Sequence, residues 1–117
     1  MKALEIVAPF DYTLKDEEGK PDATIFRLRG LTSLEYMEVS MLTKMRGEHI
    51  VLDHRAMSVT LGYGLAGWSK MKGADGADVP FSKNMTDNLN RLPLDVLTEL
   101  AVKIFDCSTV SRQDEKN

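Results

Sequence analysis

The sequence of 117 residues contains one cysteine, Cys107, so a disulfide bond within the chain is excluded. The lack of disulfides is typical of proteins in a reducing compartment. Basic residues are also few, because 15 lysines and arginines stand against 18 aspartates and glutamates, for a net charge of −3. Such a chain has no electrostatic basis for holding a phosphate backbone, so we expect no nucleic-acid partner. No apolar run approaches the roughly 18 residues of a membrane-spanning helix, and Glu5 and Asp11 interrupt any signal-peptide core. These absences predict a protein of the cytoplasm with no membrane partner.

The residues that are present predict one folded domain over residues 1–117. Hydrophobic residues make up 43% of the chain and charged residues 28%, a composition typical of globular proteins. A chain of this length can bury a core without disulfides or metals. We expect a mainly helical α+β domain with an extended or strand region at 1–30, a helical core at 31–110 and a frayed tail at 111–117. A small β-hairpin is expected at 68–81.

Two stretches near the N-terminus predict short strands. Apolar residues alternate with others over residues 3–14, where Pro9 limits the strand, and again over residues 23–29, where Phe26 and Leu28 point the same way. The charged segment 16–21 contains glycine and proline and predicts the turn between them. Because an isolated hairpin is marginally stable, these strands must pack on the helices or join another sheet.

Two helices are expected next, over residues 32–47 and 48–66. The first begins with a capping-box pattern in Thr32 and Glu35, and Gly47 is expected to end it. Its apolar residues recur three and four apart, as do others in the second helix, which predicts an apolar stripe on each. The stripe of the first helix consists of Leu34, Met37, Met41 and Met45, with Leu42 beside it. Core packing is the first interpretation of these methionines and of Met57, and an adaptable binding groove is the second.

The second helix is expected to end among Gly62, Gly64 and Gly67, which predicts either close packing there or a left-handed cap at Gly67.

Asp75-Gly76 is a strong hairpin signal, for which we expect a type I′ turn. A weak helix is expected over residues 83–91. A last helix should run from Pro93 to about Cys107 with a wide apolar face made of Val96, Leu97, Leu100, Ala101, Ile104 and Phe105.

No set of residues predicts catalysis. His49 and His54 are five apart, which on the expected helix separates them by about 140° and prevents them from sharing a metal. Cys107 has no nearby cysteine, and the Gly62-x-Gly64-x-x-Gly67 pattern follows a helix instead of a strand, unlike a nucleotide-binding loop. Tyr63, Trp68 and Phe81 are interpreted as core aromatics. We therefore predict no enzyme and assign no catalytic, cofactor or metal residue, and the partner-binding residues stay unassigned.

Several segments resemble the tail assembly chaperones of long, non-contractile-tailed bacteriophages and their prophage relatives. They lie between residues 26 and 117, and they are Phe26–Thr32 with Tyr36, the glycine run Leu61–Gly67 with Trp68, Asp75-Gly76, Val79–Ser82, Leu92-Pro93, the stripe Leu97, Leu100, Ala101 and Ile104, and the tail Glu115–Asn117. The chain departs from the family at Gly30, where proline is expected, and at the polar stretch Asp106–Thr109.

The resemblance implies a chaperone in the host cell cytoplasm that binds the long, apolar, helical tape measure protein and keeps it soluble. It also implies a role in recruiting the tail tube protein during assembly. The alternative is a structural minor tail or head–tail joining protein that stays in the virion. Association of the chain with copies of itself is left open.

Overall fold

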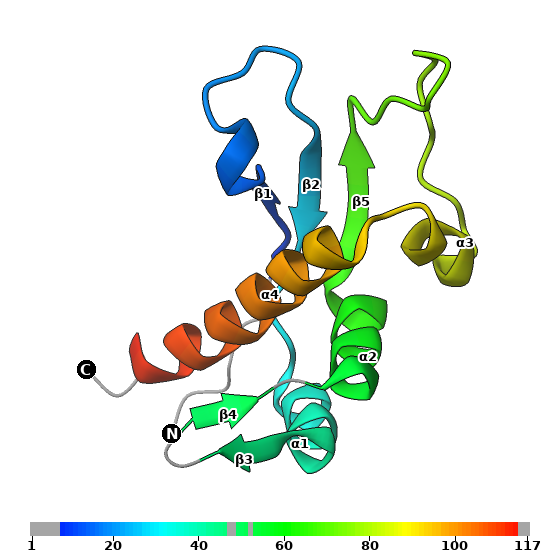
Figure 1. The fold of residues 1–117 in the computed structure, drawn as a ribbon. Helices are drawn as coiled ribbons and strands as arrows, with labels where there is room; N and C mark the ends of the chain where they lie inside the picture. The colour runs from blue at the N-terminus through cyan, green and yellow to red at the C-terminus, as the bar shows by residue number, and fades with distance from the viewer. Residues whose placement is uncertain (1–7, 47–48, 52, 115–117) are drawn as a thin grey trace.

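The computed structural model describes residues 8–46, 49–51 and 53–114 and has the expected α+β architecture (Figure 1). In chain order the elements are β1 (Phe10–Tyr12), the 3₁₀ turn η1 (Lys15–Glu17), β2 (Ile25–Leu28), α1 (Ser33–Leu42), β3 (Lys44–Arg46), β4 (His49–Val51), α2 (His54–Gly64), β5 (Leu65–Ser69), α3 (Met85–Asn90) and α4 (Leu94–Asp114).

The main sheet is antiparallel, with the strand order β1-β2-β5. Phe26 lies opposite Tyr12 on one side and Trp68 on the other, so these rings share one face of the sheet. Phe26 and Leu28 are buried while Arg27 between them is exposed, which confirms the predicted alternation. The predicted pair of strands joins a third strand, β5, which is one of the two outcomes that the sequence analysis allowed, although β5 begins at Leu65, before the strand expected from Trp68 onward.

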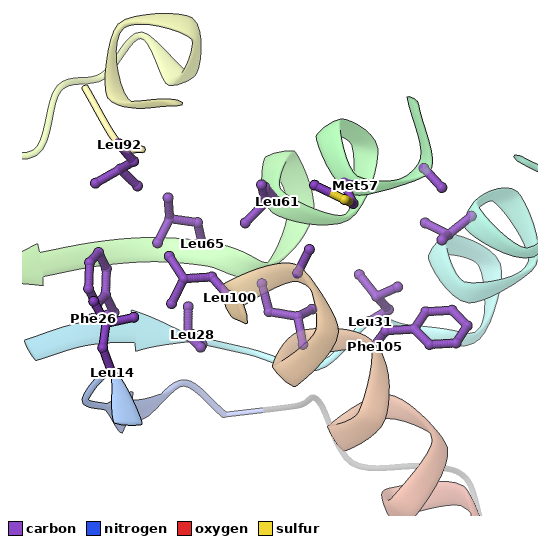
Figure 2. Close-up of a cluster of buried hydrophobic side chains, with 14 residues drawn as sticks. Leu14, Phe26, Leu28, Leu31, Met57, Leu61, Leu65, Leu92, Leu100 and Phe105 are labelled. Atoms are coloured by element: carbon purple, nitrogen blue, oxygen red, sulfur yellow. The ribbon is translucent and has the colours of Figure 1, made fainter. Parts of the chain in front are cut away.

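The core lies between this sheet, α4, which crosses it, and α2, which contributes Met57 and Leu61 (Figures 1 and 2). Leu28 of the sheet and Leu100 and Ile104 of α4 are each 0% exposed. The expected apolar face of the last helix is therefore confirmed. The helix itself is longer than predicted, because it continues past Cys107 to Asp114 and includes residues 111–114 of the expected tail. Residues 115–117 lie outside the described residues.

The glycines at the end of α2 allow close packing. A Cβ atom built on Gly64 would lie 2.5 Å from Ile104 Cγ2 and 3.0 Å from the carbonyl oxygen of Arg29. Gly62, by contrast, faces open space. The close-packing interpretation is thus confirmed for Gly64. The predicted left-handed cap at Gly67 is wrong, since Gly67 is extended and lies inside β5 opposite Arg27.

The predicted boundary between the first two helices is wrong. α1 ends at Leu42, so Met45 lies in β3 instead of on the helix, and α2 begins only at His54. Between them β3 pairs with β4, with Met45 opposite Ile50. The β-branched Ile50 and Val51 favour a strand, and the Asp53 carboxylate accepts a hydrogen bond from the Ala56 N–H at 2.9 Å, which fixes the start of α2. Gly47 lies outside the described residues.

The hairpin expected at 68–81 is reduced to one isolated bridge, since β5 ends at Ser69, and its turn also differs from the expected one. Lys72 and Asp78 form a bridge, and the loop Ala74–Gly76 is closed by a hydrogen bond from the Gly73 N–H to the Ala77 oxygen. Gly76 has a φ of +82°, whereas Asp75 is not left-handed. A type I′ turn needs positive φ at both of its central residues, so that prediction is wrong. The loop instead belongs to the class of three-residue hairpin loops in which one residue is left-handed.

The three aromatics predicted to be core are half-buried and pack against the edge of the core. Trp68 donates its indole N–H to the Val79 oxygen at 2.8 Å. Its ring packs edge-on against that of Phe81, with 4.9 Å between the ring centres. These contacts attach the hairpin to the sheet.

The weak helix expected at 83–91 is present as α3, where the Asn84 side chain accepts a hydrogen bond from the Thr86 N–H.

Candidate binding surface

The residues first considered for chemistry lie on different elements. His49 lies in β4 and His54 opens α2, so they do not share one helix as the sequence analysis assumed. Within the described part of the chain, no group of three histidines, cysteines or acidic residues could hold a metal ion. Cys107 is a free thiol, half-buried within α4 instead of near its end.

Among the side chains that the structure describes, the three most exposed large apolar ones lie on one face of α1. Leu34, Met37 and Met41 are 77%, 61% and 85% exposed, although all three are large and apolar. They are spaced three and four residues apart and therefore lie along one side of the helix. We call these three residues the α1 face. The sequence analysis preferred to place this stripe in the core, and for these residues that interpretation is wrong.

The core side of α1 is formed by other residues. Val39 is fully buried, and the Tyr36 ring stacks on Phe105 of α4 with 4.9 Å between ring centres. Leu42 is half-buried against the same core. α1 thus has apolar residues on two opposite sides. Because only one side can contact the core, the other side remains in solvent.

The start of α1 is fixed by a charged network around Glu35. Arg29 donates two hydrogen bonds to the Glu35 carboxylate, at 2.8 and 2.9 Å. The same carboxylate accepts from the Thr32 N–H at 2.9 Å, and the Thr32 hydroxyl accepts from the Glu35 N–H, so the predicted capping box is confirmed. The hydrogen bond from Arg29 is the main cause that lowers the pKa of Glu35 to about 2. The orientation of α1 is therefore well defined.

A second attachment comes from α4. The Ser108 hydroxyl accepts a hydrogen bond from the Leu31 N–H at 2.6 Å and donates one to the Ile104 oxygen at 2.8 Å. Ser108 belongs to the polar stretch Asp106–Thr109 near the middle of α4. Its hydroxyl gives the backbone just before the capping box a hydrogen-bond partner, which is a structural reason for a polar residue there.

One edge of the α1 face is acidic. Glu38 is exposed, and its carboxylate accepts a hydrogen bond from the Tyr63 hydroxyl of α2 at 2.5 Å. This hydrogen bond is the largest of the causes that raise the pKa of Tyr63 above its ordinary value. Glu38 is four residues from Leu34 and three from Met41, so its carboxylate lies beside the apolar side chains.

No protein-family model, curated protein or solved structure matches the chain. Over the residues described, none of the helices combines the length and hydropathy needed to cross a membrane. The α1 face is therefore interpreted from its own geometry. The partner-binding residues, which sequence reasoning left unassigned, have their best candidates in Leu34, Met37 and Met41. The i, i+3, i+7 spacing of these residues was visible, but the sequence did not show which side of the helix faces solvent.

Proposed function

We propose that the protein is a phage tail assembly chaperone whose α1 face binds a helical, apolar segment of the tape measure protein and keeps it soluble. In this proposal it acts in the host cell cytoplasm and also aids assembly of the tail tube protein. The observation that carries the proposal is the exposure of Leu34, Met37 and Met41 on one side of a helix whose start is fixed by an ion pair and a capping box.

Exposed methionines suit a chaperone. Methionine is unbranched and polarisable, so Met37 and Met41 can adapt to apolar segments of differing shape. A helical partner would place its own apolar residues against this face, as in other helix-mediated contacts. Contact with water is unfavourable for such side chains, so their burial on both proteins supplies the affinity.

The small size of the α1 face suits reversible binding. Stable protein complexes bury about 800 Å² on each partner, which three side chains on one helix cannot provide alone. A contact of this kind is expected to be weak for each copy of the chain. A tape measure protein that binds several copies would stay soluble and could still release them when the tail tube assembles around it.

The test is co-expression of the chain with the tape measure protein encoded beside it. The wild-type chain should keep the tape measure protein soluble and co-purify with it, and binding should persist at 0.5 M salt because apolar contacts are not screened. The double variant Met37→Glu/Met41→Glu should lose both effects. The matched control is Leu94→Glu/Val102→Glu, which makes the same change at two exposed apolar residues of α4, 59% and 42% exposed.

Two results would contradict the proposal. A tape measure protein that stays insoluble with the wild-type chain, with no co-purification, would exclude the chaperone function. Recovery of the chain in stoichiometric amounts from purified virions would favour the alternative, a structural minor tail or head–tail joining protein.

A further inference from the structure

We infer that the α1 face selects an amphipathic helix with basic side chains beside its apolar stripe, and that Glu38 is the residue that reads this charge. The inference rests on the proposed function in one respect, because it describes the partner helix of the same surface. It does not depend on which protein supplies that helix.

The two edges of the α1 face differ in chemistry. At about 100° per residue, Leu34, Met37 and Met41 fall within an arc of about 60° on the helix. Glu38 lies about 40° beyond one edge of this arc, and the hydroxyls of Ser33 and Ser40 lie beyond the other. An approaching helix would therefore meet an apolar strip with a carboxylate on one side and neutral hydroxyls on the other.

The carboxylate of Glu38 is available to a partner. Its one hydrogen bond is from the neutral Tyr63 hydroxyl, which leaves its negative charge uncompensated. Within the described part of the chain, no lysine, arginine or histidine lies within ion-pair distance of it. α1 itself contains no basic residue, and the nearby Arg29 is bonded to Glu35. A lysine or arginine on the partner would supply the missing positive charge.

One helix fits this surface better than a second copy of the chain. α1 has 10 residues, which gives a strip about 15 Å long and one helix wide. A second copy would present its own Glu38 and no basic residue from α1, so pairing of two α1 faces would bring two carboxylates to one seam. The net charge of −3 on each copy adds to this repulsion.

The test uses two synthetic helical peptides that share one leucine stripe. In one peptide the positions that flank the stripe are lysines, and in the other they are glutamates. Each peptide carries a fluorophore, and binding to the full chain is measured by fluorescence anisotropy at 0.05 and 0.5 M salt. The variants are Glu38→Gln, which removes the charge, and Met41→Glu, which disrupts the apolar strip. Val102→Glu on α4 is the control for an added charge.

The wild-type chain should bind the lysine peptide about two- to fivefold more tightly than the glutamate peptide at low salt, since exposed charge pairs contribute modestly. This preference should shrink in Glu38→Gln and at 0.5 M salt, while binding itself persists. Met41→Glu should abolish binding of both peptides, and Val102→Glu should leave it unchanged. Circular dichroism of each variant confirms that the chain is folded.

Equal affinity for the two peptides at low salt, or an undiminished preference in Glu38→Gln, would overturn the inference. A wild-type chain that sediments as a dimer, together with a Met41→Glu variant that sediments as a monomer, would also overturn it. These results are separate from those of the co-expression test. A chain that prefers lysine peptides but leaves the tape measure protein insoluble would retain the charge preference and lose the chaperone function.

Discussion

α4 and α1 have similar apolar spacing in the sequence and opposite environments in the structure. In α4, Leu100 and Ile104 are fully buried, whereas in α1 Met37 and Met41 remain mostly exposed. The difference lies in the neighbours of each helix. α4 crosses the sheet and also packs on α2, while α1 packs chiefly on α2 and contacts the core through Val39, Tyr36 and Leu42. The comparison shows that a stripe of apolar residues predicts a contact surface, and the topology decides whether that contact lies inside the molecule.

The buried stripe of α4 gives the largest predicted effect. Leu100→Ala should lower the free energy of unfolding by about 2–5 kcal/mol, through lost apolar burial and the cavity left behind. Urea denaturation followed by circular dichroism measures this change. Thr98→Ala, two residues away on the exposed side of α4, should change it little. Similar small losses in both variants would mean that α4 does not anchor the core.

The contact between α2 and α4 can be tested with two glycines of the same helix. Gly64→Ala should destabilise the protein by about 1–3 kcal/mol, because the new methyl group would overlap with Ile104 and the Arg29 backbone. Gly62→Ala adds the same atom in open space and should stabilise α2 by up to about 1 kcal/mol. Thermal unfolding should move in opposite directions for the two variants. A shift in the same direction would refute the close packing.

The attachment of α1 should depend on pH through Glu35. Its pKa is about 2 in the folded protein, below the usual 4.5, so its ion pair and cap stabilise the fold above pH 4.5. That contribution is lost as the pH falls from 4.5 towards 2. Glu35→Gln should cost about 1–2 kcal/mol at pH 7. It should also lose less stability than the wild type when urea denaturation is repeated at pH 2.5, and an equal loss in both would contradict the role of Glu35.

Much of the fold could be predicted where local chemistry decides it. The alternation around Phe26 gave β2, the Thr32–Glu35 pair gave the start of α1, and the apolar face around Leu100 gave α4. The errors arise where pairing with another segment of the chain determines the secondary structure. Trp68 was expected to begin a strand, but Leu65 and Ala66 were expected to end the second helix, and they become part of β5 because β2 offers them an edge. The short segments around Met45 and Ile50 pair with each other and were interpreted as the ends of helices.

The binding surface was harder to predict for a related reason. α1 is apolar on both sides, with Val39 and Tyr36 on one and Met37 and Met41 on the other. Spacing alone cannot tell which side meets the core. The residue types offered a weak signal, since a β-branched and an aromatic residue lie on the buried side and two methionines on the exposed side.

The most direct test of this account compares stability and binding in one variant. Met37→Glu/Met41→Glu should unfold within about 0.5 kcal/mol of the wild type, as is usual for exposed positions, and should no longer retain the tape measure protein in solution. Leu94→Glu/Val102→Glu should keep both properties. A double variant of α1 that is as stable as the wild type and still holds the tape measure protein soluble would contradict the claim that the α1 face is the binding surface.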